Sequence, residues 1–175
     1  MEDFLFRFTY VFVSTALVLG GFTAGFLALV FFAKGFVQQR AQVRDSILRR
    51  HARMYRGWQC FPVQSCNQEH FEAWKKVIVW QETGVLFVKD NRADFYSDVR
   101  ARTPLRIDLS NGGIEWIGRR YWPNGEFYWF AVDQLGGPYY FTAEAGQWVF
   151  SSRQRTKEVY DELVNRGLQA THTFN

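Results

Sequence analysis

One uncharged segment constrains this chain more than any other feature of its sequence. Phe8–Ala33 are 26 consecutive residues without Asp, Glu, Lys, Arg or His, and Phe, Val, Leu, Ala and Gly dominate them. At about 1.5 Å per residue, a helix of this length exceeds the roughly 30 Å hydrocarbon core of a bilayer. The segment therefore predicts a transmembrane helix over residues 8–33, after a short tail of residues 1–7.

A secretory signal peptide is the alternative interpretation of this segment. The apolar region of a signal peptide would be shorter, and the residues before it would be basic. Here the preceding residues include Glu2 and Asp3 beside Arg7, and the apolar run is too long. We therefore expect a retained span in a single-pass integral membrane protein.

Small residues recur every four positions along the predicted span. Such spacing places them on one helix face, where they let a second helix approach closely, although Gly and Ala are also simply common in membrane spans. The predicted helix-packing residues are Ala16, Gly20, Gly21, Ala24, Gly25 and Ala28.

Positive charge is concentrated directly after the span. Residues 34–56 hold seven Lys or Arg and one acid, whereas residues 57–175 hold 13 basic and 14 acidic side chains. The positive-inside rule then places the C-terminal domain on the cytoplasmic or matrix side of the membrane. We favour the mitochondrial inner membrane over a bacterial inner membrane.

Residues 34–56 have a helical pattern with a narrow apolar stripe, and Gly57 ends it. Two interpretations remain open for this basic helix. It is either a stalk that lifts the domain off the membrane, or a helix that lies along anionic headgroups. The predicted contacts with anionic lipid are Arg40, Arg44, Arg49, Arg50 and Arg53.

A turn-rich connector is predicted over residues 57–76, with a short helix from Gln68 to Lys76, and a β-rich domain follows over residues 77–175. Short apolar and alternating runs separated by turn residues predict its strands. Asn124-Gly125 is the clearest hairpin turn, because both residues tolerate positive φ angles. A final helix is predicted from Arg155 to Arg166, and Gly167 ends it. The predicted strands include Val77–Trp80, Gly84–Val88, Leu105–Leu109, Gly113–Ile117, Arg119–Trp122, Phe127–Val132, Tyr139–Thr142 and Gln147–Phe150.

This order of elements predicts a small α+β domain. Its bent sheet or partial barrel of six to eight strands is closed off by the C-terminal helix. The order resembles the pleckstrin-homology-like architecture, in which a seven-stranded barrel is capped by its last helix. The resemblance covers residues 77–167 and lies in element order alone, so it implies a fold and no binding residues.

Few residues in the chain have the spacing that catalysis or metal binding requires. Cys60, Cys66 and His70 are the one candidate group for a metal, but five residues separate the two cysteines and no second pair exists. We expect two reduced thiols, with a disulfide as the alternative. The common nucleophile, phosphate-binding and zinc-protease motifs are missing. The sequence therefore predicts no enzyme activity, no cofactor and no metal, and the near-neutral domain argues against nucleic-acid binding.

Aromatic residues make up 19% of the chain, and they crowd the hairpin over residues 121–130. Pairing of Trp122 with Phe127 across the predicted turn would place large rings on both faces of the hairpin. One face is needed for the core of the domain, and the other is covered either by the final helix or by a partner protein. We favour the partner. The predicted contacts are Tyr121, Tyr128 and Phe130.

The sequence therefore favours a non-catalytic accessory or structural subunit of a multi-subunit membrane protein complex. A mitochondrial respiratory or ATP-synthase assembly would be an example of such a complex. Its expected partners are other subunits of the complex and membrane lipid, including anionic headgroups. The alternative is a membrane-tethered regulatory module that binds lipid or peptide.

Overall fold

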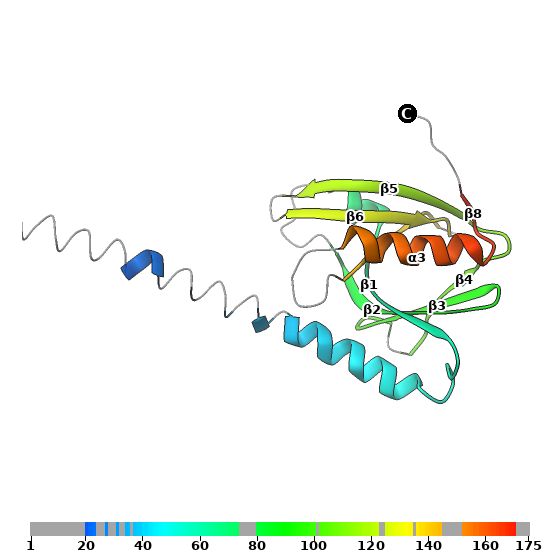
Figure 1. The fold of residues 1–175 in the computed structure, drawn as a ribbon, viewed down its shortest axis with the longest axis horizontal. Helices are drawn as coiled ribbons and strands as arrows, with labels where there is room; N and C mark the ends of the chain where they lie inside the picture. Colours follow the sequence, from blue (N-terminus) through cyan, green and yellow to red (C-terminus); the bar gives the residue numbers. More distant parts are fainter. Residues whose placement is uncertain are drawn as a thin grey trace, which may run out of the picture. The chain divides into compact units, whose positions relative to one another are not determined.

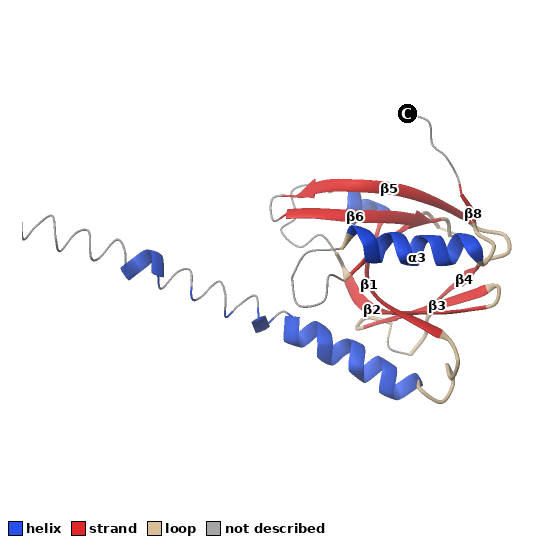
Figure 2. Cartoon of the chain, viewed as in Figure 1, coloured by secondary structure: helices blue, strands red, loops and turns tan. Residues whose placement is uncertain are grey.

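The computed structural model describes residues 20–23, 27, 31, 34–35, 37–73, 80–100, 102–122, 125–134, 136–144 and 152–170. The chain divides into two compact units, Met1–Phe36 and Val37–Asn175. In the first unit the described residues are helical. The second unit holds a helix over residues 37–51, an eight-stranded sheet and a C-terminal helix (Figures 1 and 2).

Among the described residues, no helix is both long and apolar enough to cross a membrane. This finding contradicts the predicted transmembrane helix over residues 8–33 and the single-pass integral localisation, with its cytoplasmic or matrix-side domain. The longest described helix, over residues 37–51, falls short of the roughly 20 apolar residues that a span requires, and it carries four arginines. Most of residues 8–33 lie outside the described part of the chain.

The second unit is built mainly from one sheet. Its elements after the 37–51 helix are β1 (Gln59–Asn67), α2 (Gln68–Glu72), β2 (Glu82–Lys89), β3 (Arg92–Ser97), β4 (Leu105–Asp108), β5 (Gly113–Trp122), β6 (Gly125–Val132), β7 (Tyr139–Ala143), α3 (Arg153–Asn165) and β8 (Gln169–Ala170).

The strands follow the order β4-β3-β2-β1-β7-β6-β5-β8. Neighbours pair in antiparallel fashion except β5 and β8, which are parallel, so the sheet is mixed. It curls into half of a barrel, and α3 packs against this curled sheet (Figure 1). The pleckstrin-homology-like architecture has seven strands and ends with its capping helix. This chain differs from it, because the parallel strand β8 follows α3.

Strand β1 lies at the centre of the sheet, although the sequence predicted a turn-rich connector there. It pairs with β2 along residues 59–65 and with β7 along residues 63–67. Proline is normally excluded from central strands because it cannot donate a hydrogen bond. Pro62 is tolerated because it lies one residue before the β7 pairing begins, where its carbonyl accepts from the Glu144 amide.

Strands β2 and β3 also differ from the prediction. The strand predicted over residues 84–88 is longer in the structure, because β2 begins at Glu82, where it pairs with β1, and it also pairs with β3. Most of the strand predicted over 77–80 lies outside the described residues. No strand was predicted over residues 92–97, which form β3. Asp94 is fully buried in that strand.

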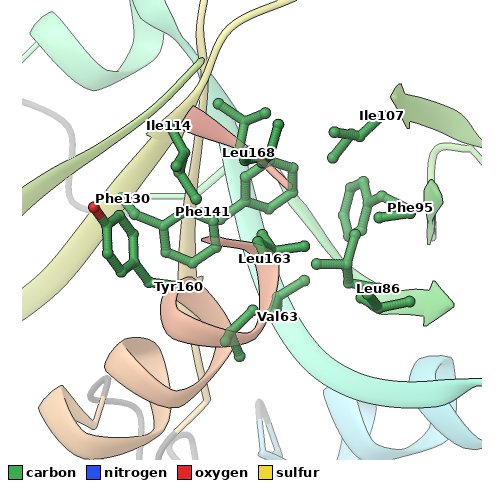
Figure 3. Close-up of a cluster of buried hydrophobic side chains, with 14 of the residues drawn as sticks. Val63, Leu86, Phe95, Ile107, Ile114, Phe130, Phe141, Tyr160, Leu163 and Leu168 are labelled. Carbon is green, nitrogen blue, oxygen red and sulfur yellow. The ribbon is translucent and has the colours of Figure 1, made fainter. Parts of the chain in front are cut away.

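The curl brings distant strands together over the inner face of the sheet, which is the face that packs on α3. The rings of Phe95 in β3 and Phe141 in β7 lie edge to face with centroids 5.3 Å apart (Figure 3). Phe141 also stacks against Phe130, and Phe130 contacts Tyr160 of α3. These rings form the centre of the main core, in which Leu163 of α3 is fully buried.

Helix α3 starts and ends close to its predicted limits. Ser152 caps its first turn, since its hydroxyl accepts from the backbone N–H of Arg155. Gly167 follows its last turn with φ of +127°, a conformation that glycine adopts without strain. The buried residues Val159, Tyr160 and Leu163 form the face that the sheet covers.

The outer face of the sheet has two separate covers. Over β6 and β7, Phe71 of α2 stacks on Tyr140 at 3.8 Å and meets Trp129 edge to face. Trp80 belongs to the same cluster, near Phe127. Part of each face of the β5–β6 hairpin is therefore buried inside the domain.

The 37–51 helix covers the outer face over β2 and β3. Its apolar stripe, which includes Val43 and Ile47, packs with Val85, Phe87 and Tyr96. The sequence had suggested either a stalk or a helix that lies on lipid headgroups. Both predictions are wrong for this apolar stripe, because the sheet already covers it. It ends at His51, and residues 52–57 form turns.

A polar contact fastens the turn after this helix to the sheet. The Tyr55 hydroxyl donates to Oδ2 of the buried Asp94 at 2.5 Å, and its ring stacks on Phe87. The Arg92 guanidinium donates to both oxygens of the same carboxylate. Because Asp94 has no exposure to water, these donors are what satisfies its charge.

Replacing Phe141 by Ala tests the contact that closes the curl. We expect Phe141→Ala to lower the free energy of unfolding by about 3–5 kcal/mol, because it empties a fully buried ring site. Urea unfolding followed by circular dichroism measures the change. Val99→Ala is the control, since Val99 is 71% exposed and its loss should cost less than about 0.5 kcal/mol. Equal midpoints for the two variants would contradict the role given to Phe141.

Replacing Tyr55 by Phe tests the polar contact through its pH dependence. Burial, followed by the hydrogen bond to Asp94, raises the pKa of Tyr55 above its ordinary value of 10. A raised tyrosine pKa gives stability that is complete below pH 10 and is lost as the pH rises further. We expect the unfolding free energy of the native chain to fall above this pH by up to about 1.4 kcal/mol per unit more than that of Tyr55→Phe. Parallel pH profiles in urea unfolding would contradict it.

Candidate functional site

A pocket opens where strands β5 and β6 meet the first turn of α3. Its lining residues are Trp116, Gly118, Arg119, Tyr128 and Arg153, and its volume is about 230 Å³. We call it the Trp116 pocket. Strand β5 supplies three of these residues, β6 supplies Tyr128, and α3 supplies Arg153.

A β-bulge in β5 brings Trp116 and Arg119 to the same face. Residues three apart in a regular strand point to opposite faces. Here Trp116 lies opposite Phe130 and Arg119 lies opposite Tyr128, with the register shift between Trp116 and Gly118. Phe130 and Tyr128 are two residues apart on β6, so their partners on β5 share one face. The extra residue of the bulge therefore creates the pocket wall.

Trp116 is held in place by the helix beneath it. Its ring meets Tyr160 of α3 edge to face, with centroids 5.4 Å apart. The ammonium group of Lys157 lies 4.3 Å from the Tyr160 ring and 5.4 Å from the Trp116 ring, while it forms an ion pair with Asp161 at 2.7 Å. These contacts fix the indole, which also lines the pocket.

Glu126 lies beside two of the pocket residues, Arg119 of β5 and Tyr128 of β6. It accepts a short hydrogen bond from the Tyr128 hydroxyl, and its Oε1 lies 3.8 Å from Nε of Arg119. The hydrogen bond to Glu126 raises the pKa of Tyr128, so the phenol stays protonated at neutral pH. Arg153 is exposed in the first turn of α3, which contains no acidic residue.

Two other hollows in the described surface have a different character. One, of about 520 Å³, is bordered by Val99, Arg100, Arg102 and Thr103 of the β3–β4 loop, and it has no aromatic lining. The other, of about 190 Å³, lies beside the opposite side of α3 and includes Glu144. The Trp116 pocket alone among these three combines tryptophan, tyrosine and arginine.

The structure separates the three predicted partner contacts. Tyr128 lines the Trp116 pocket. Phe130 is fully buried between Phe141 and Tyr160, so its prediction as a partner contact is wrong: α3 covers that part of the hairpin. The side chain of Tyr121 lies outside the described part of the chain.

The register of the hairpin also differs from the prediction. Trp122 lies opposite Gly125 and Arg120 lies opposite Phe127, so Gly125 belongs to β6 instead of the turn. Every predicted pair shifts by two residues. Because the shift is even, the faces assigned to the residues of β6 are unchanged.

The predicted lipid-contacting arginines fall into two groups. Arg40 is buried, with its guanidinium 5.5 Å from the Trp80 ring, and burial lowers its pKa. Arg44 lies 3.8 Å from Glu144, a carboxyl group whose pKa burial raises. Both therefore serve contacts inside the domain. The other three are exposed, and their contact with anionic lipid stays a prediction: Arg49, Arg50 and Arg53.

Two of the predicted helix-packing residues are described. Gly20 and Gly21 are exposed in a helical segment with open space around them. The other four lie outside the described residues: Ala16, Ala24, Gly25 and Ala28.

The two cysteines are in different surroundings. Cys60 is exposed, Cys66 is buried, and neither forms a disulfide within the described chain. Burial of its sulfur still raises the pKa of the Cys60 thiol, which lowers its reactivity at neutral pH. Within the described residues, no group of three or more His, Cys, Asp or Glu side chains could hold a metal ion.

Sequence reasoning missed Trp116, Gly118, Arg119 and Arg153 as one group. Gly118 was the available sign, because an isolated glycine inside a strand pattern often marks a bulge. Its φ of +77° confirms the unusual backbone. Arg153 could not have been connected to β5 from sequence, since 33 residues and two described strands, β6 and β7, separate it from Arg119.

Comparison with known proteins finds no matching family model, no similar curated protein and no similar solved structure.

Replacing Gly118 by Ala tests the bulge. At φ of +77° an alanine is strained, and we expect Gly118→Ala to lower the free energy of unfolding by about 1–3 kcal/mol. Urea unfolding measures this loss. Gly35→Ala is the control, because Gly35 is helical with nothing within 4 Å of an added Cβ. If both variants unfold at the same urea concentration as the native chain, the bulge does not depend on glycine.

Proposed function

We propose that this chain is a non-catalytic accessory subunit of a multi-subunit complex and that it binds another protein through the Trp116 pocket. The observation that supports the proposal most directly is the composition of the pocket. Tryptophan, tyrosine and arginine are the residues most enriched among the strongest contacts of protein interfaces. All three line this one pocket, in Trp116, Tyr128, Arg119 and Arg153.

The size of the pocket also favours a protein side chain as its occupant. Sites for drug-sized ligands and cofactors typically measure about 300–1,000 Å³. The Trp116 pocket measures about 230 Å³, which is below that range. A hollow of this size fits one anchoring side chain, whereas the surrounding surface of β5, β6 and α3 can make the wider contact.

Rigid support from the core suits this role. Trp116 rests on Tyr160, whose ring contacts Phe130, and both Phe130 and Tyr160 belong to the main core. A side chain that is already ordered loses little conformational entropy on binding. The pocket is therefore prepared for a partner before the partner arrives.

Reversing the charge of Arg153 tests the proposal. We expect Arg153→Glu, combined with Tyr128→Ser, to reduce recovery of partner chains with the tagged full-length protein by at least about tenfold, because two interface contacts are lost. Native electrophoresis in mild detergent, followed by identification of the comigrating chains, measures the loss. The variant should stay folded, since an acid in the first turn of α3 favours the helix dipole.

Arg106→Glu is the matched control. It also reverses one exposed arginine, but on β4 and away from the pocket. It should retain the partners that the native chain retains. Undiminished recovery with the Arg153→Glu, Tyr128→Ser variant, with a native circular dichroism spectrum, would show that the pocket is not the interface.

A further inference from the structure

The wall of the Trp116 pocket consists mainly of hydrogen-bond donors. The indole of Trp116 and the guanidinium groups of Arg119 and Arg153 can donate but cannot accept. A Cβ at Gly118 would stand 3.5 Å from Nε1 of Trp116, so the glycine leaves the space beside the indole N–H open. The nearby acceptor, Glu126, already receives the Tyr128 hydroxyl. A ligand that fits this wall must supply acceptors.

The pocket also has more positive than negative charge. Arg119 faces Glu126, and Lys157 is paired with Asp161. Arg153 adds a further positive charge, and both it and Arg119 act electrostatically on the Tyr128 hydroxyl. Residues 57–175 carry 13 basic and 14 acidic side chains, so this local excess does not follow from the composition of the domain.

We propose that the Trp116 pocket binds an acidic side chain, Asp or Glu, of the partner protein. This inference rests on the proposed function and adds the chemistry of the contact. The carboxylate accepts hydrogen bonds from Arg153 and from the indole N–H, and its methylene groups lie against the Trp116 ring. Arg119 has five N–H donors, so it can interact with the incoming carboxylate while it remains near Glu126.

Two other anions fit the pocket less well. A phosphoryl group carries about −1.5 to −2 charges at neutral pH, and the single excess positive charge matches a carboxylate better. A C-terminal carboxylate is usually held by successive backbone N–H groups. The donors described here belong to side chains, which is the pattern of acidic-motif recognition by arginines.

A pair of small probes isolates the carboxylate. N-acetyl-glutamate α-methylamide has one side-chain carboxylate and no free C-terminus, and N-acetyl-glutamine α-methylamide replaces that carboxylate with an amide. Each is titrated into the full chain while the indole resonance of Trp116, assigned with Trp116→Phe, is followed by NMR. We expect the glutamate probe to bind about tenfold more tightly, as charge-assisted hydrogen bonds to arginine imply.

Variants connect that difference to the pocket. Arg153→Gln should bring the affinity of the glutamate probe down to that of the glutamine probe, whereas Arg106→Gln should leave it unchanged. Equal binding of the two probes to the native chain would overturn the acidic-side-chain inference. Tighter binding of O-phosphoserine α-methylamide, acetylated at its N-terminus, would overturn it in favour of a phosphorylated partner.

The two proposals fail separately. If the probes bind equally but Arg153→Glu with Tyr128→Ser still releases the partner, the protein-binding function stands and the acidic contact is wrong. If the glutamate probe prefers the native pocket but the same double variant keeps every partner, the pocket binds acids without serving as the interface.

Discussion

The ring contact between Phe95 and Phe141 joins strands that are three places apart in the sheet, β3 and β7. In a flat sheet, strands three places apart would be separated by about 14 Å, at about 4.8 Å per strand. The 5.3 Å between the ring centroids is possible only because the sheet curls. The curl creates a concave inner face, and α3 fills it with Val159, Tyr160 and Leu163. The rest of the domain depends on this closure.

A curled sheet with apolar residues on both faces needs further covers on its outer side. Successive residues of β2 show this, since Leu86 belongs to the inner core and Phe87 to the cluster under the 37–51 helix. That requirement explains why Arg40 is buried: it belongs to the helix that covers the outer face of the sheet. Burial lowers the pKa of Arg40 and raises that of Glu144. Burial thus disfavours the charged form of both groups, and the packing of the helix, more than the attraction between the two charges, keeps them in place.

Sequence patterns identified those strands and helices in which the local preference of the residues matches their burial in the folded domain. The alternation of β4, the apolar run of β6, the final helix and its glycine stop could be predicted because local preference and tertiary position agree. Strand β1 could not, since Pro62 is acceptable only because the pairing with β7 begins one residue later, at Val63. Strand β3 could not, because Asp94 is buried only with Tyr55 and Arg92 as its donors. At the pocket, Tyr128 was predicted from the aromatic hairpin, whereas Arg153 depends on how α3 crosses the sheet.

The bulge and the curl together determine where the Trp116 pocket forms. The curl sets α3 against β5 and β6, and the bulge turns Arg119 to the same face as Trp116. Strand β8 pairs with β5 only at Gly113 and Ile114, so its pairing ends before Trp116. Elsewhere the two helical covers and α3 occupy the aromatic surface of the sheet for the core. Trp116 is only partly buried because it lies at the margin of that packing, where its ring contacts Tyr160 and also lines the pocket.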